Sequence, residues 1–122
     1  MNLIMKNVID KSVQLENLQI YFKLFKLHKS YLALISDQKA MGIGDVTLGT
    51  PPKLKGSKSA SSSYNLFGIR QQLLSSILIK KISKYLDAPV LLLLFIKSKI
   101  EENEITKPLI NFINKNLQSL EE

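Results

Sequence analysis

The glycines in residues 40–52, AMGIGDVTLGTPP, suggest chemistry first, because glycine-rich loops can surround a phosphate with backbone amides. A dinucleotide-binding loop needs the spacing G-x-G-x-x-G between a strand and a helix. Here Gly42, Gly44 and Gly49 are spaced G-x-G-x-x-x-x-G and two prolines follow. The P-loop pattern also fails, because no Gly-Lys-Ser or Gly-Lys-Thr follows at the required offset. We therefore interpret Gly42 and Gly44 as residues that allow a bulge or a close approach in a strand.

The titratable side chains offer little for catalysis or metal binding. His28 is the only histidine and the chain has no cysteine, so neither an imidazole cluster nor a thiolate zinc site can form. We interpret His28 as a solvated turn residue after a predicted strand. Asp37 and Asp45 flank a further predicted strand, where aspartates commonly stabilise turns and strand ends. We expect a protein that is not an enzyme and needs no cofactor or metal.

The chain is basic, with 17 Lys and Arg against 10 Asp and Glu and a formal net charge of +7 at pH 7. Arg70 is its only arginine, although proteins that read bases or grip phosphates favour the planar fork of arginine. A nucleic-acid partner is therefore disfavoured. The positive charge is expected instead to guide encounters with an acidic protein surface.

A basic, serine-rich segment at about residues 49–63, GTPPKLKGSKSASSS, interrupts the apolar pattern. Its composition and length predict a flexible loop within a single domain that spans residues 1–122. Such a loop could become ordered against an acidic partner, and the alternative is a solvated linker that makes no contact. The candidate partner-binding residues are Lys53, Lys55, Lys58 and Arg70.

Short apolar runs predict strands upstream of this loop. Residues 18–27 alternate apolar and polar side chains, residues 31–36 are almost continuously apolar, and residues 41–48 form a third run. The short connections between these runs predict an antiparallel meander. A further edge strand is predicted within residues 3–9 or 13–15.

Downstream of the loop, residues 62–67 predict a short strand, and apolar residues then recur at helical spacing over residues 69–86. Residues 90–96, VLLLLFI, predict a strand buried on both faces. That apolar run is the longest in the chain and is too short to cross a bilayer as a helix, so no membrane contact is expected. Pro108 is expected near the start of a C-terminal helix. The predicted fold class is α+β, with a long amphipathic helix and a C-terminal helix packed on an antiparallel or mixed sheet.

The order of these elements, with several short motifs, resembles the small proteasome assembly chaperones, the third and fourth members of that set. The motifs are SYLALISDQKAMGIGDVTL, YNLFG and DAPVLLLLFIKSK, the last following the amphipathic helix. The Met41–Gly42 pair resembles the third member, and the serine-rich approach to Leu66 and Gly68 resembles the fourth. The resemblance covers residues 18–120.

This resemblance implies a non-enzymatic chaperone that forms a heterodimer with a related small chaperone. Such a heterodimer helps the α subunits of the 20S proteasome to assemble into a ring. The implied location is the cytoplasm, with the nucleus as a further one. The lysine-serine loop has no counterpart in the family. Two other functions fit the same elements: a nucleic-acid-binding module that uses the basic loop, and a trafficking adaptor of longin or profilin type.

Overall fold

The computed structural model describes residues 3–52, 62–68, 70–99 and 101–121. Within these residues the chain forms six strands, two α-helices and a short 3-10 helix. In chain order the elements are β1 (Lys6–Leu15), β2 (Leu18–Leu27), β3 (Ser30–Ser36), β4 (Asp45–Thr50), β5 (Ser62–Phe67), α1 (Gln72–Leu86), β6 (Val90–Phe95), α2 (Glu102–Gln118) and η1 (Ser119–Glu121). The predicted α+β fold class is confirmed, as are the bounds of the strands predicted at residues 18–27 and 62–67.

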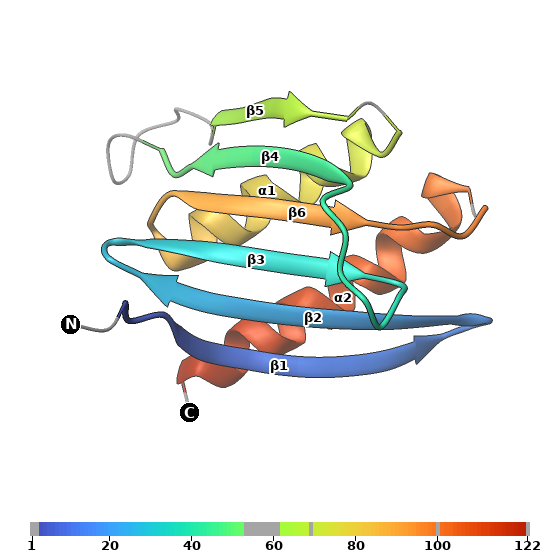
Figure 1. Cartoon of the computed structure of the whole chain (residues 1–122), viewed down its shortest axis with the longest axis horizontal. Helices are drawn as coiled ribbons and strands as arrows, with labels where there is room; N and C mark the ends of the chain where they lie inside the picture. Colours follow the sequence, from blue (N-terminus) through green and yellow to red (C-terminus); the bar gives the residue numbers. More distant parts are fainter. Residues whose placement is uncertain (1–2, 53–61, 69, 100, 122) are drawn as a thin grey trace.

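The strands form one mixed sheet in the order β1-β2-β3-β6-β4-β5, and both helices lie on the same face of it (Figure 1). Strands β1, β2 and β3 make an antiparallel meander, and β5 pairs antiparallel with β4 at the far edge. Strand β6 pairs parallel with β3 and antiparallel with β4. The most apolar strand of the chain is therefore in the interior of the sheet, where neighbours on both sides shield it from water.

The predicted pairing of the third strand is wrong. Residues 41–48 were expected to continue the meander, but β4 begins at Asp45 and β6 separates it from β3. The connection from β3 to β4 crosses the face of the sheet that the helices leave uncovered (Figure 1). Strand β6, which follows α1 in the chain, therefore lies between β3 and β4 in the sheet. The meander is instead completed by β1, because the predicted short edge strand extends over residues 6–15.

The hydrophobic core lies between the sheet and the two helices. Leu92 and Leu94 on β6 and Leu78 on α1 are at most 1% exposed. Phe112 on α2 meets Phe22 on β2 edge-on, with the ring centroids 6.4 Å apart. Burial of side chains of this size, at about 25 cal/mol per Å² of apolar surface, is the main favourable contribution to folding. The predicted amphipathic faces of both helices are thus used by the sheet.

Helix α2 begins earlier than predicted, which places Pro108 inside the helix instead of near its start. Glu102 and Glu104 lie in the first turn of α2, where their negative charge is favourable beside the helix N-terminus. The Glu102 carboxylate also accepts a hydrogen bond from the backbone N–H of Leu74 in α1, at 3.1 Å. Pro108 has no N–H to donate to the carbonyl four residues earlier, so the acidic first turn and the packed apolar face must stabilise a helix that proline weakens.

Gly44 is required where the chain enters β4. Its φ of +60° lies in the left-handed region that residues with a Cβ rarely adopt. A Cβ at this position would also collide with the backbone carbonyl of Leu94 on β6. The prediction of a close backbone approach thus holds at Gly44, although Gly42 and Gly44 lie in a loop and not in a strand.

We expect Gly44→Ala to lower the free energy of unfolding by about 2 kcal/mol or more, because the substitution combines left-handed strain with a clash against β6. Urea unfolding followed by circular dichroism measures this quantity. Lys39→Ala, in the same loop but exposed, is the control and should change stability by no more than about 0.5 kcal/mol. Equal stabilities for the two variants would contradict the role assigned to Gly44.

Candidate protein interface

The face of the sheet opposite the helices is apolar and has no covering element among the described residues. Along β6, Val90, Leu92 and Leu94 point into the core, so Leu91, Leu93 and Phe95 point the other way. We call this surface the open face. The apolar side chains of the open face are Tyr21, Phe25, Leu27, Leu32, Leu34, Val46, Leu48, Tyr64, Phe67, Leu91, Leu93 and Phe95.

Strand register places these side chains in rows across the sheet. Leu91 lies between Leu32 on β3 and Leu48 on β4, and Phe25 and Tyr64 extend this row. The next row is centred on Leu93, which lies between Leu34 and Val46. Directly opposite and diagonal side chains on adjacent strands touch, so the two rows merge into one surface. The centre of the open face therefore consists of aliphatic side chains from three adjacent strands.

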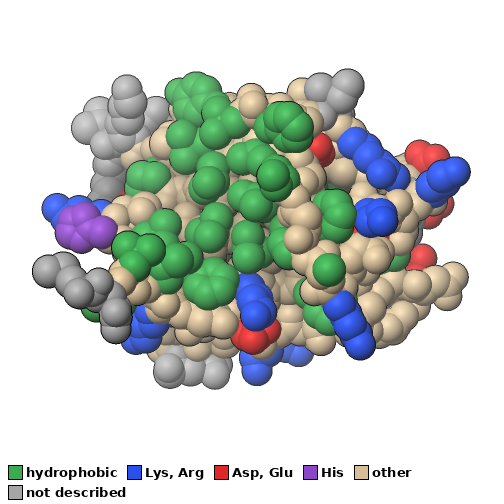
Figure 2. All heavy atoms as spheres, in the orientation of Figure 1, with side chains coloured by type: hydrophobic (Ala, Val, Ile, Leu, Met, Phe, Trp, Pro, Cys, Tyr) green, Lys and Arg blue, Asp and Glu red, His purple; other side chains and the backbone are tan. Residues whose placement is uncertain are grey.

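Figure 2 views this surface directly and shows one continuous hydrophobic area over the middle of the sheet, with lysines toward its margin. On β5 the exposure is large, with Tyr64 54% and Phe67 63% exposed. The five strands that carry these side chains, about 4.8 Å apart and about 20 Å long, present a face of roughly 500 Å². Its apolar part is comparable with the largest apolar patch on a typical monomer. A patch of this size on a small chain is typical of a protein-binding surface.

The β3–β4 loop, residues 37–44, crosses the open face near one end (Figure 1). Gly42 rests on the Phe95 ring, since a Cβ at Gly42 would lie 2.6 Å from the nearest ring carbon. Met41 and Ile43 are 37% and 63% exposed. Between this loop and the meander is a hollow of about 350 Å³, whose apolar lining includes Tyr21 and Met41. The loop thus gives the otherwise flat face a ridge and a hollow that could fix the orientation of a partner.

Asp37 anchors the start of this loop to the segment after β6. Its carboxylate accepts hydrogen bonds from the backbone N–H groups of Lys97 and Ser98, both at 2.9 Å. Burial opposes ionisation of Asp37, but these bonds, together with those from the Ser98 hydroxyl and the Gln38 side chain, outweigh it. The pKa of Asp37 is therefore held below its ordinary value. The charged carboxylate has a structural role here, as predicted for turn aspartates.

Asp45 and His28 also have positions that need no catalytic role. The buried Asp45 carboxylate accepts a hydrogen bond from the backbone N–H of Gln71, so it holds the N-terminal end of α1 against β4. His28 is exposed in the tight turn between β2 and β3, where its carbonyl accepts a hydrogen bond from the Ser30 hydroxyl. The described part of the chain holds no group of three or more potential metal ligands. It also holds no helix of the length and apolarity needed to cross a membrane.

The structure leaves the predicted partner-binding lysines untested, because Lys53, Lys55 and Lys58 lie outside the described residues. Arg70 is exposed, and its guanidinium donates hydrogen bonds of 3.3 and 3.4 Å to the carbonyls of Lys97 and Ser98. Its role toward a partner stays a prediction.

The open face was not predicted from the sequence. One sequence feature nevertheless points to it: the unbroken apolar run of residues 90–96 predicts a strand that is covered on both faces. Both helices cover the same face of the sheet (Figure 1). Within the described residues, the second face of this apolar strand has no covering helix.

Comparisons with known proteins give a likeness of fold. No protein-family model and no curated protein matches the sequence. Among solved structures, the chain is similar to one described as a novel chaperone complex for yeast 20S proteasome assembly, with a TM-score of 0.58. The match covers 94% of this chain and 99% of that chain at 8% sequence identity. The two chains therefore share their fold over nearly their whole lengths.

We expect Asp37→Asn to lower the free energy of unfolding at pH 7 by about 1 to 3 kcal/mol, because an amide cannot accept the two backbone hydrogen bonds as strongly. The folded pKa lies below the unfolded value of about 3.9, so the contribution of Asp37 is complete above that value. This contribution is lost as the pH falls through the folded pKa. Urea unfolding at a series of pH values should show the two proteins converging below about pH 4.

Asp10→Asn provides the matched control, since Asp10 is exposed and pairs with Lys23 at 3.7 Å on the surface. It should cost no more than about 1 kcal/mol. A constant difference between the wild-type protein and Asp37→Asn down to pH 2 would contradict the assigned role of the charge.

Proposed function

We propose that this protein is a non-enzymatic chaperone for assembly of the proteasome α-ring, and that it acts as one half of a heterodimer with a related small chain. The open face is proposed to be the surface that packs on the partner. The observation that carries the proposal is the apolar face itself, on a fold similar to that of a proteasome assembly chaperone complex.

The side chains at the centre of the open face support a binding role. Leu91, Leu93 and Val46 offer contact area and no group that could activate a substrate. Sheets pack face to face about 10 Å apart when aliphatic side chains interdigitate, which is the arrangement that two such open faces would form. Burying about 800 Å² on each partner is usual for a stable complex, so the open face would form the apolar centre of a larger contact.

Charge favours a related partner over a second copy of this chain. Two copies would each bring a formal charge of +7, and their mutual repulsion opposes association. The lysines lie toward the margin of the open face (Figure 2), where a partner with acidic residues at its own margin would attract them. A related chain with more acidic than basic residues could pack on the apolar centre of the open face and pair with the lysines at its margin.

We expect Leu93→Asp to abolish partner binding, lowering recovery of the second small chain at least about tenfold, because the substitution buries a charge at the centre of the interface. The experiment is affinity purification of the tagged full-length chain from cells, with mass spectrometry of the proteins recovered. The wild-type protein should bring down a related small chain and proteasome α subunits. Leu48→Asp on the neighbouring strand should have the same effect.

Leu73→Asp is the matched control, because Leu73 on α1 is 66% exposed and lies on the helix side of the sheet. This variant should recover the partner at the wild-type level, and circular dichroism should show that all variants are folded. Partner recovery unchanged in both Leu93→Asp and Leu48→Asp would contradict the interface. Recovery of nucleic acid or vesicle-coat proteins in place of α subunits would contradict the function.

A further inference from the structure

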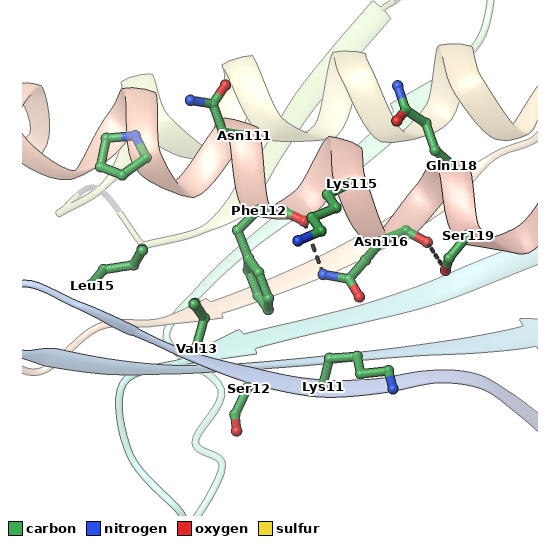
Figure 3. Close-up of a pocket in the computed structure, with 11 residues that line it drawn as sticks. Lys11, Ser12, Val13, Leu15, Asn111, Phe112, Lys115, Asn116, Gln118 and Ser119 are labelled. Atoms are coloured by element: carbon green, nitrogen blue, oxygen red, sulfur yellow. Dashed lines mark hydrogen bonds between the residues drawn. The ribbon is translucent and has the colours of Figure 1, made fainter.

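A second surface lies on the helix side of the molecule, along β1 at the edge of the sheet. A groove of about 680 Å³ runs between β1 and α2, and Figure 3 shows the side chains that line it. Its apolar part includes Val13 and Leu15 from β1 and Phe112 from α2. The Phe112 ring points from α2 toward Val13 (Figure 3). Val13 and Leu15 are only half-buried, so α2 leaves the inner side of β1 partly uncovered.

β1 has a free backbone edge along this groove. Among the described residues β1 pairs with β2 alone, and β2 occupies one of its two edges. The N–H and C=O groups on the other edge are therefore available to an added strand. An extended peptide that pairs there would direct every second side chain into the groove, beside Lys11, Val13 and Leu15 in turn.

The charge of the groove selects the kind of peptide. Lys11 and Lys115 both line it, and its lining contains no carboxylate. Both side chains are exposed, and neither takes part in an ion pair within the described residues. The Asn116 amide, also at the groove, is directed to the Phe112 carbonyl at 2.9 Å and does not neutralise either lysine. The groove therefore has an apolar floor and two lysines that lack an internal counter-charge.

We propose that the groove between β1 and α2 binds an extended acidic peptide segment of another protein, which adds to the sheet beside β1. A carboxylate of the peptide pairs with Lys11, and Lys115 adds to the positive charge of the groove. Two apolar side chains, at alternate positions from the carboxylate, contact Val13, Leu15 and Phe112. The site lies on the opposite side of the sheet from the open face, so it goes beyond the proposed function and does not depend on it.

The lysines also argue against a second copy of this chain as the occupant. Lysine on an edge strand commonly prevents edge-to-edge pairing of identical sheets, because two such edges repel each other. With Lys11 on each copy, pairing of two β1 strands would bring cations together at the groove. An acidic segment removes that repulsion and gains charge-assisted hydrogen bonds from the ammonium groups.

The test uses the peptide Thr-Val-Thr-Val-Thr-Glu-Thr, labelled with a fluorophore and added to the full-length protein in low salt. In the antiparallel arrangement its two valines face Leu15 and Val13, and its glutamate faces Lys11. Fluorescence anisotropy should show saturable binding that weakens as salt rises. A peptide with lysine in place of glutamate should bind at least about tenfold more weakly, which corresponds to about 1.4 kcal/mol.

The double variant Lys11→Glu and Lys115→Glu should reverse this preference and bind the lysine peptide better. Lys80→Glu with Lys81→Glu, an equal charge change on exposed positions of α1, should leave the preference of the wild-type protein unchanged. Equal binding of both peptides by the wild-type protein, or the same response in the two double variants, would overturn the proposal. Leu93→Asp should bind the acidic peptide normally, so failure at the groove and failure at the open face can be distinguished.

Discussion

The fold depends on one constraint: two helices on one side cannot cover both faces of a sheet whose central strands are apolar on both. Strand β6 carries aliphatic or aromatic side chains at every position from Val90 to Phe95. The helices bury one set of these side chains, and the other set meets similar side chains of β3 and β4. The hydrophobic effect therefore gives the chain a core on one face of the sheet, and on the other an apolar surface that no described element covers.

Other features hold β6 in the middle of the sheet. Asp37 binds the backbone just after β6, and Gly44 lets the incoming chain approach the Leu94 carbonyl closely. Asp45 fixes the start of α1 against β4. These polar and conformational contacts lie at one end of the sheet, around the loop that borders the open face. The same residues that stabilise the fold thus shape the margin of the proposed interface.

Periodicity in the sequence was sufficient for the type of most elements, since residues 18–27 and 62–67 form strands with those bounds and α1 begins within a few residues of its expected start. It was not sufficient for strand order. Short connections favoured a meander through residues 41–48, whereas the chain crosses the sheet there and β6 pairs with β3. Pairing between distant strands depends on which apolar faces meet, and a local pattern does not contain that information.

Local sequence patterns were also insufficient to predict the candidate site. Single residues were interpreted correctly where local chemistry decides, as for the turn residue His28 and the loop aspartate Asp37. The open face is built from partly exposed side chains of five strands, so it exists only once the sheet has formed. The groove beside α2 is likewise lined by residues of β1 and α2, which lie far apart in the sequence. Surfaces that are assembled from distant segments could be located only in the folded chain.

The central claim is that another protein covers the open face, and hydroxyl-radical labelling with mass spectrometry tests it most directly. Labelling of Phe25, Phe95 and Leu93 would be compared between the chain alone and the complex purified from cells, with exposed Leu73 on α1 as the internal reference. The account predicts that labelling of the open-face residues falls in the complex while that of Leu73 is unchanged. Equal labelling of the open face in both samples would contradict it.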